Sequence, residues 1–249
     1  MPPLHLSFSA CGFLGVYHLG AATALRGRGL LRDVTGLAGA SAGALTAAVL
    51  LTAPGQIEAC TKFTYDLAEE ARARVLGPAT PGFDLMSRVR AALDAVLPRD
   101  AHELARGRLL VSVTRVAGLQ GRRVSDFASR DELITVLLAS CFVPVYAGLK
   151  PVEHAGQLWM DGGLTDSLPV MSTGRTVTFS PFAGSADVSP REHAWACVSV
   201  AGQDVAVSWA NLVRARQAMF PACRQTLEAI YHRGMTDTVR FLREELRPP

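Results

Sequence analysis

The strongest constraint on the fold is a run of very small residues around one serine, Gly39–Gly43 (GASAG). This run matches the pattern G-x-S-x-G. It lies between Val34–Ala38, which predicts a strand, and Ala42–Leu51, which predicts a buried helix. A serine held on so sharp a strand-to-helix turn tolerates only small neighbours, and the helix start favours negative charge beside it. The pattern therefore predicts an α/β fold in which Ser41 is a nucleophile.

Other interpretations of this region stay open. Gly39 and Gly43 also have the spacing of a G-x-x-x-G helix-packing pattern, and the run equally suits a small-residue turn in a core. The stretch Gly36–Ala53 has 18 residues without a charge, which only just reaches the length of a membrane-spanning helix. Because it is rich in Gly and Ala and ends abruptly at Pro54, a buried helix is the better prediction.

The rest of the chain alternates predicted strands and helices. This alternation predicts an α/β fold with a central, mostly parallel sheet and helices on both faces. We expect one domain over residues 1–249, with a core in residues 1–182 and a helical C-terminal part in residues 205–249. Further strands are predicted at Leu4–Phe8, Leu109–Val116, Arg123–Phe127, Pro151–Glu153, Gln157–Met160, Thr176–Ser180 and Ala194–Val200. Further helices are predicted at Val16–Arg26, Gln56–Arg74, Phe83–Val96, Asp131–Cys141, Val207–Phe220 and Arg224–Arg243.

Composition excludes several classes of protein. With 49% hydrophobic and 19% charged residues, the chain is not intrinsically disordered. The net charge of +3 and the scattered Lys and Arg do not predict nucleic-acid binding, although a weakly basic surface would help contact with anionic lipid. The five cysteines form no CxxC pair, so we expect free thiols in an intracellular protein and no zinc site. The N-terminus has no basic region typical of a secretory signal.

A second small-residue segment, Ser9–Gly15 (SACGFLG), follows the first predicted strand. It is a near miss to the dinucleotide-binding pattern G-x-G-x-x-G, but the first glycine is missing, and Asp33 precedes the second strand instead of closing it. A better interpretation is an oxyanion hole made of backbone N–H groups, with an ordinary turn as an equal alternative for this segment alone. The expected donors are Cys11, Gly12, Phe13, Gly15 and Ala42.

The candidate acid is Asp161, in the segment WMDGG at 159–163. An acid followed by Gly162 and Gly163 can present its carboxylate from an open turn. A plain Asp-Gly turn is common, however, and on this segment alone it is the more frequent explanation. Asp166, five residues further on, is interpreted as a turn or cap residue.

Four blocks of the sequence carry a family likeness in their order and spacing. They are CGFLGVYHLGAA at 11–22, GASAG at 39–43, LLASCFVPVYAGL at 137–149 and WMDGGLTDSLP at 159–169. Together they resemble the patatin-like phospholipases, within the branch of adiponutrin and adipose triglyceride lipase. The resemblance covers nearly the whole chain, and it is most like a short animal member that lacks the long C-terminal extension of the lipases.

The resemblance implies a patatin-like three-layer fold and a catalytic dyad of Ser41 and Asp161, with the glycine loop as oxyanion hole. It implies hydrolysis of acylglycerols, phospholipids or retinyl esters, or transfer of acyl chains between lipids, without metal or organic cofactor. It also implies a cytoplasmic enzyme that meets its lipid esters at a membrane or lipid-droplet surface. Ala10 stands where several relatives have a glycine, so a positive φ there would cost about 1 kcal/mol.

In the expected mechanism Asp161 takes the Ser41 proton, an acyl-enzyme forms, and water or a lipid alcohol accepts the acyl group. Partial burial would raise the aspartate pKa and make it a better base. No histidine is expected to act as base. After Asp161 only His193, in a predicted surface loop, and His232, near the expected end of a helix, remain. The alternatives are a non-catalytic lipid-binding protein of this fold and a soluble nucleotide-binding module.

The predicted helix Val207–Phe220 carries Trp209 and Phe220 alongside Arg214 and Arg216. A basic amphipathic helix of this kind can lie in a lipid interface. The alternative, which the sequence favours, is that its apolar face packs into the core.

Overall fold

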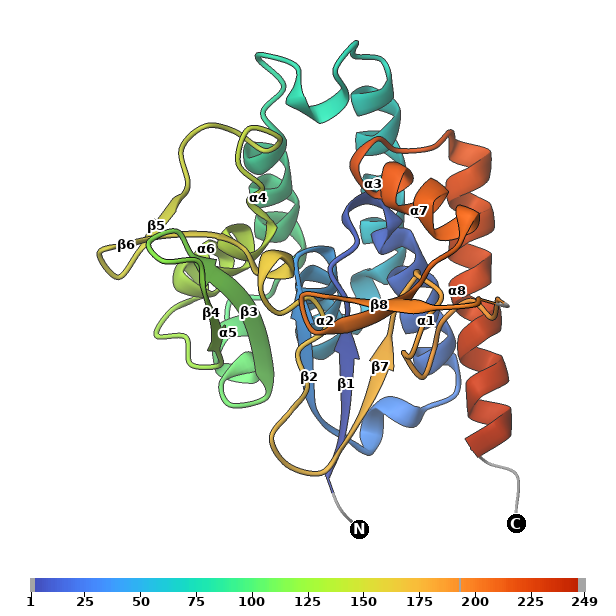
Figure 1. Ribbon diagram of the computed structural model, residues 1–249. Coiled ribbons are helices and arrows are strands. Elements are labelled where there is room, and N and C mark those ends of the chain that lie inside the picture. The colour runs from blue at the N-terminus through green and yellow to red at the C-terminus, as the bar shows by residue number, and fades with distance from the viewer. Residues whose placement is uncertain (1–2, 193, 246–249) are drawn as a thin grey trace.

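The computed structural model describes residues 3–192 and 194–245, and its centre is a seven-stranded sheet (Figure 1). The sheet has the order β5-β6-β3-β2-β1-β7, with β4 paired to β3. Its strands are β1 Leu4–Phe8, β2 Val34–Ala40, β3 Leu109–Arg115, β4 Gln120–Val124, β5 Val152–His154, β6 Gln157–Asp161 and β7 Arg175–Phe179. A separate two-stranded hairpin is formed by β8 Cys197–Val200 and β9 Gln203–Ala206.

The middle of the sheet is parallel and deeply buried. Strands β7, β1, β2 and β3 run parallel to one another, while β4, β5 and β6 add an antiparallel edge. All residues of β2 are buried except Thr35, as expected for a parallel strand that is covered on both faces. The predicted α/β fold with a central, mostly parallel sheet and flanking helices is confirmed.

Eight α-helices surround the sheet in the described part of the chain. They are α1 Gly15–Gly27, α2 Ala42–Thr52, α3 Ile57–Arg72, α4 Leu85–Val96, α5 Ala101–Ala105, α6 Arg130–Cys141, α7 Trp209–Met219 and α8 Arg224–Glu245. Short 3-10 helices are η1 Gly12–Leu14, η2 Leu30–Arg32, η3 Pro54–Gln56, η4 Gly77–Ala79 and η5 Gly162–Leu164. Within residues 3–192 and 194–245, no helix has both the length and the apolar character needed to cross a membrane.

Helix α8 runs along α1 (Figure 1). The two helices touch backbone to backbone, because a Cβ at Gly20 would lie 2.0 Å from the carbonyl oxygen of Tyr231, and one at Gly234 would lie 2.0 Å from that of Tyr17. The Tyr17 hydroxyl also donates a 2.9 Å hydrogen bond to the fully buried carboxylate of Asp237. The C-terminal helix is therefore firmly joined to the first helix of the chain.

The expectation that the apolar face of Val207–Phe220 packs into the core is wrong. In α7 only Asn211 and Ala218 are buried, while Trp209 is 79% exposed and Phe220, just beyond the helix, is 53% exposed. The helix is instead held by polar contacts, since the Asn211 amide donates 2.8 Å hydrogen bonds to the carbonyl oxygens of both Ala183 and Ala206.

Smaller differences concern where elements begin and end. The strand expected at Arg123–Phe127 is β4 at Gln120–Val124, because Gly118 and Leu119 already make the turn with positive φ. The expected strand Ala194–Val200 is reduced to β8 at Cys197–Val200. His232 is exposed and far from the helix end expected for it, because α8 continues to Glu245.

Candidate active site

Ser41 stands alone between the end of β2 and the start of α2, with φ 54° and ψ −131°. Such a conformation costs a non-glycine residue about 1–3 kcal/mol, and strain of this kind is concentrated at functional sites. The small neighbours allow it, because a Cβ at Gly43 would lie 2.2 Å from the carbonyl oxygen of Phe8, and one at Gly39 would lie 2.6 Å from the backbone nitrogen of Ala44. The GASAG run therefore lets α2 begin directly against the strand ends.

Ser140, the penultimate residue of α6, holds this strained turn in place. The backbone N–H of Ser41 donates to the Ser140 Oγ at 2.8 Å, and that hydroxyl donates to the Ser112 carbonyl oxygen at 2.7 Å. Ser140 is fully buried. Ser140 was not predicted as a site residue, because the sequence marks it only by its position in the block LLASCFVPVYAGL.

Asp161, the last residue of β6, faces the serine. Its Oδ2 accepts a 2.6 Å hydrogen bond from the Ser41 hydroxyl, and its Oδ1 accepts one of 2.6 Å from the Gly163 backbone N–H. The following turn fits only because Gly162 has no side chain, since a Cβ there would lie 2.0 Å from the Ser112 carbonyl oxygen. Two residues 120 positions apart in the sequence are thus in direct contact.

The Asp161 carboxyl is 5% exposed, and this burial raises its pKa from 3.8 to about 6. The hydrogen bonds from the Ser41 hydroxyl and the Gly163 N–H act in the opposite direction. Asp161 is therefore still ionised at neutral pH but is more basic than an aspartate in water. Burial raises the pKa of the nearby Cys11 and Cys141 thiols, which leaves them neutral and poorly nucleophilic.

The glycine loop between β1 and α1 lies beside the serine. Gly12 begins η1 with φ 53°, and a Cβ there would lie 2.2 Å from the Ala218 carbonyl oxygen of α7. Gly12 and Ala42 are the first residues of their helices, where N–H groups have no acceptor within the helix. The φ angle of Ala10 is not positive, so the backbone strain considered for this alanine is absent. The predicted residues that line the same cavity as Ser41 are Cys11, Gly12, Phe13, Gly15, Ala42, Asp161 and Gly163. The prediction of Gly15 as an oxyanion donor is wrong, because its N–H donates to the Gly12 carbonyl oxygen.

This cavity has a volume of about 590 Å³ and is predominantly apolar. Residues of α2, α3 and α4 line the cavity, and so do residues of α7 and of the β8–β9 hairpin. Its main lining residues from helices are Leu45, Val49, Phe63, Leu67, Val89, Leu93, Asn211, Ala215, Ala218 and Met219. Such a space suits the hydrocarbon part of a lipid.

The other titratable candidates do not reach the serine. Asp166 lies outside the cavity lining, and its Oδ2 accepts a 2.7 Å hydrogen bond from the Arg123 Nε, which replaces the turn or cap role expected for it. No histidine lines the cavity within residues 3–192 and 194–245. His193 lies outside the described residues.

Comparisons with known proteins show the family to which this fold belongs. The family described as "Patatin-like phospholipase" matches residues 6–173. Patatin-like phospholipase domain-containing protein 4 of Homo sapiens is 53% identical over 249 residues, covering 98% of this chain and 98% of the relative. The human domain-containing protein 2 is 41% identical over 242 residues, covering 96% of this chain and 48% of the relative. Human 1-acylglycerol-3-phosphate O-acyltransferase PNPLA3 is 37% identical over 244 residues, covering 96% and 50%.

The chain therefore belongs to the patatin-like phospholipases. It spans about half the length of the two longer relatives and nearly all of the short one. The family that the four sequence blocks indicate is confirmed, and so is the similarity to a short member of it.

Proposed function

We propose that this protein hydrolyses carboxylic esters of lipids, with Ser41 as nucleophile and Asp161 as its general base. The observation that carries the proposal is the 2.6 Å hydrogen bond from the Ser41 hydroxyl to Asp161 inside a largely apolar cavity. Because burial raises the Asp161 pKa to about 6, the carboxylate can accept the serine proton at neutral pH.

In the proposed reaction the Ser41 oxygen attacks the ester carbonyl while its proton passes to Asp161. The negative oxygen that develops is stabilised by backbone N–H groups of the glycine loop, with Gly12 and Ala42 as the donors at the two helix starts. The alcohol then leaves as Asp161 returns the proton to it. An acyl group remains on Ser41, and the apolar stripes of α2, α3 and α4 hold its hydrocarbon chain.

Water then attacks the acyl-enzyme, with Asp161 again taking the proton, and a fatty acid is released. A lipid alcohol entering in place of water would give acyl transfer. The human relative that is 37% identical is named an O-acyltransferase, which supports this second outcome for the same site. The chemistry needs no metal or organic cofactor, and the lipid esters would be met at a membrane or lipid-droplet surface.

The test is hydrolysis of long-chain triacylglycerol, phospholipid and retinyl ester by purified wild type and Ser41→Ala. We expect Ser41→Ala to keep its melting temperature and to lose at least about a thousandfold in kcat on whichever ester the wild type cleaves. Ser199→Ala, on the exposed strand β8, is the matched control and should retain full activity. Activity of Ser41→Ala within tenfold of wild type would exclude the proposed nucleophile.

A further inference from the structure

The turn after α3 forms the upper end of the molecule in Figure 1. This turn and its two neighbours, the loop after α6 and the end of α7, carry five exposed apolar side chains. We call them the apical patch. Val75 is 98% exposed and Leu149 is 88% exposed, so neither stabilises the isolated fold by packing. Exposed apolar groups that cluster in this way mark a binding surface. The apical patch consists of Val75, Leu76, Val145, Leu149 and Phe220.

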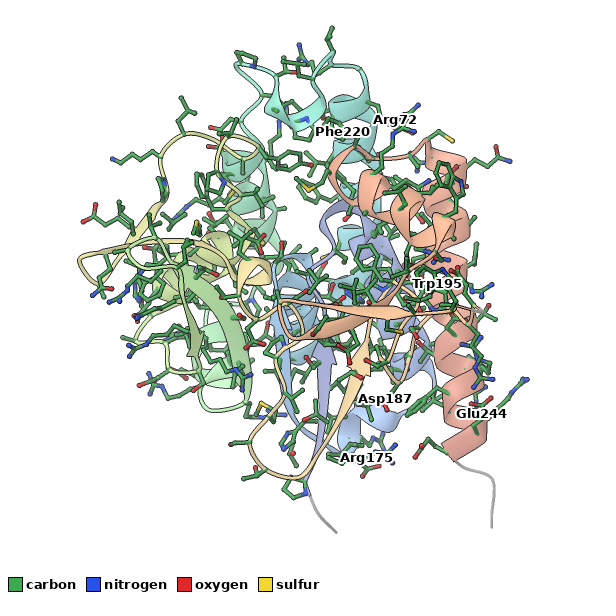
Figure 2. All side chains as sticks on the ribbon, in the orientation of Figure 1. Arg72, Arg175, Asp187, Trp195, Phe220 and Glu244 are labelled. Carbon is green, nitrogen blue, oxygen red and sulfur yellow. The ribbon has the colours of Figure 1, made fainter. Side chains whose placement is uncertain are left out.

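The patch comes from three segments that are far apart in sequence but touch one another. The turn after α3 reaches the end of α7, since a Cβ at Gly77 would lie 3.3 Å from the Phe220 ring, and the Arg72 Nη1 donates to the Pro221 carbonyl oxygen at 2.9 Å. Figure 2 shows Arg72 and Phe220 close together at this end. The loop after α6 joins the same place, because the Tyr146 hydroxyl donates to the Met219 carbonyl oxygen at 2.6 Å.

Two of these segments also form part of the cavity that holds Ser41 and Asp161. Val143 and Tyr146 line the cavity from the loop that carries Val145 and Leu149, and Met219 lines it next to Phe220. The loop after α6 and the end of α7 therefore carry apical-patch residues on the outside and cavity-lining residues on the inside, while the turn after α3 packs against the end of α7. A lipid surface in contact with the patch would lie against this wall of the cavity.

The charged residues around the apical patch indicate which kind of surface the patch would bind. Residues 71–83, 142–150 and 215–227 contain no Asp or Glu, and Lys and Arg occur in each of the three segments. One acid, Asp84, lines a surface pocket with Leu149 and Lys150, and its carboxylate accepts hydrogen bonds from the Ser87 N–H and hydroxyl. Arg74, Lys150 and Arg216 are exposed, and none of them forms an ion pair with any residue the structure describes. Unpaired basic groups beside inserted apolar groups are the combination that binds anionic lipid, at about 1 kcal/mol for each basic residue near the membrane surface.

We propose that the apical patch docks this protein on an anionic phospholipid surface, with Val75, Leu149 and Phe220 inserted among the lipids and Arg74, Lys150 and Arg216 at the headgroups. This inference rests on the proposed function for its purpose, since it explains how lipid esters reach the cavity. It names the docking surface and its charge preference, neither of which follows from the dyad.

The experiment measures sedimentation with vesicles of phosphatidylcholine alone and of phosphatidylcholine mixed with phosphatidylserine. Wild type should bind the mixed vesicles more tightly than the neutral ones. Val75→Glu combined with Leu149→Glu should weaken binding by at least about tenfold, because two inserted apolar groups become charged. Arg74→Gln combined with Lys150→Gln should weaken binding to the mixed vesicles alone, by about fivefold for each charge removed. Trp195→Glu is the matched control, because Trp195 is 88% exposed and lies away from Phe220 in Figure 2.

Two readouts separate docking from catalysis. The patch variants should react with a fluorophosphonate and cleave a water-soluble short-chain ester as wild type does, since their side chains do not line the cavity. Ser41→Ala should bind vesicles normally even though it is inactive. Unchanged vesicle binding by the Val75 and Leu149 double variant would overturn the proposal. Equal binding of wild type to both vesicle types, or an equal loss in Trp195→Glu, would overturn it as well.

Discussion

Helices α2 and α7 both have eleven residues and line the same cavity, yet they are attached to the protein in different ways. In α2 most residues are buried, and it carries no large aromatic side chain. In α7 the large apolar residues Trp209 and Leu212 face solvent, and only Asn211 and Ala218 are buried. Each helix carries four large apolar residues, so their number does not explain the difference in burial. Helix α2 contains no charged residue and begins against the backbone of β1, whereas α7 carries Arg214 and Arg216.

The contacts explain the difference. Gly43 brings α2 within van der Waals distance of the Phe8 carbonyl, so the helix start and Ser41 are fixed by the sheet itself. The inner side of α7 makes a similar approach at one point, where the Ala218 carbonyl meets Gly12. Its other attachments include the Asn211 amide and the hydrogen bond from the Tyr146 hydroxyl to the Met219 carbonyl oxygen. We therefore describe α2 as the fixed wall and α7 as the outer wall of the cavity.

The largest effect is expected at the proposed base beside the fixed wall. Asp161→Asn should lower kcat by about a thousandfold, since a positioned general base contributes about 10²–10⁴. In wild type, kcat/KM should fall as the pH drops through about 6, because the carboxylate becomes protonated. A variant that keeps both its rate and this pH dependence would show that Asp161 is not the base.

The raised pKa of Asp161 also predicts the direction in which Asp161→Asn changes the stability of the protein. The folded-state pKa of Asp161 is raised, so the folded state holds the proton more tightly than the unfolded state. The stability that this proton confers is lost as the pH rises through about 6. At neutral pH the melting temperature of Asp161→Asn should therefore be no lower than that of wild type. Thermal unfolding of both proteins at pH 5 and pH 8 tests this prediction.

The next effect tests how tightly α2 is held. Gly43→Ala should lower the free energy of unfolding by at least about 3 kcal/mol, because its Cβ would meet the Phe8 backbone at 2.2 Å and backbone cannot move aside cheaply. Gly55→Ala, where a Cβ meets no atom within 4 Å, is the matched control. If urea unfolding gave the same midpoint for both variants, the close approach would not be what fixes this wall.

A smaller effect is expected at Ser140. Ser140→Ala leaves the buried N–H of Ser41 without its acceptor, which should cost about 1–3 kcal/mol of stability. It should also slow fluorophosphonate labelling and lower kcat more than it changes KM, since the Ser41 backbone is no longer held. Ser189→Ala is the control, because this buried serine donates to the Ala186 carbonyl, outside the cavity lining. Equal labelling rates would limit Ser140 to a purely structural role.

The smallest effect is expected on the outer wall. Trp209→Ser should change the free energy of unfolding by less than about 0.5 kcal/mol, because the Trp209 side chain is exposed. Ala218→Leu, on the inner side of the same helix, should both destabilise the protein and slow hydrolysis. A large loss of stability in Trp209→Ser would instead support packing of this helix into the core, as the sequence favours. Helix α7 would then not differ from α2 in the way described above.

The sequence was enough to predict the buried position of α2, the fixed wall, but not the exposed position of α7, the outer wall. The elbow at Ser41 could be predicted because tiny residues at this spacing, between a strand and a helix, suit a nucleophile turn. Asp161 was indicated by the family resemblance, because on its own segment a plain Asp-Gly turn is the more frequent explanation. The burial of α7 could not, because its apolar and basic residues fit either a core or an interface, and Asn211 gives no signal of its tertiary partners. The role of Ser140 could not be predicted either, because a hydrogen bond between residues 99 positions apart leaves no local pattern in the sequence.

The central claim is that the nucleophile in this cavity is Ser41 and not one of the neighbouring thiols. The most direct measurement is mass spectrometry of the wild-type protein after reaction with a fluorophosphonate, with peptide mapping of the adduct. The account predicts a single adduct on Ser41, no adduct on Cys11 or Cys141, and no labelling of Ser41→Ala. An adduct on another residue, or labelling of Ser41→Ala at the wild-type rate, would contradict it.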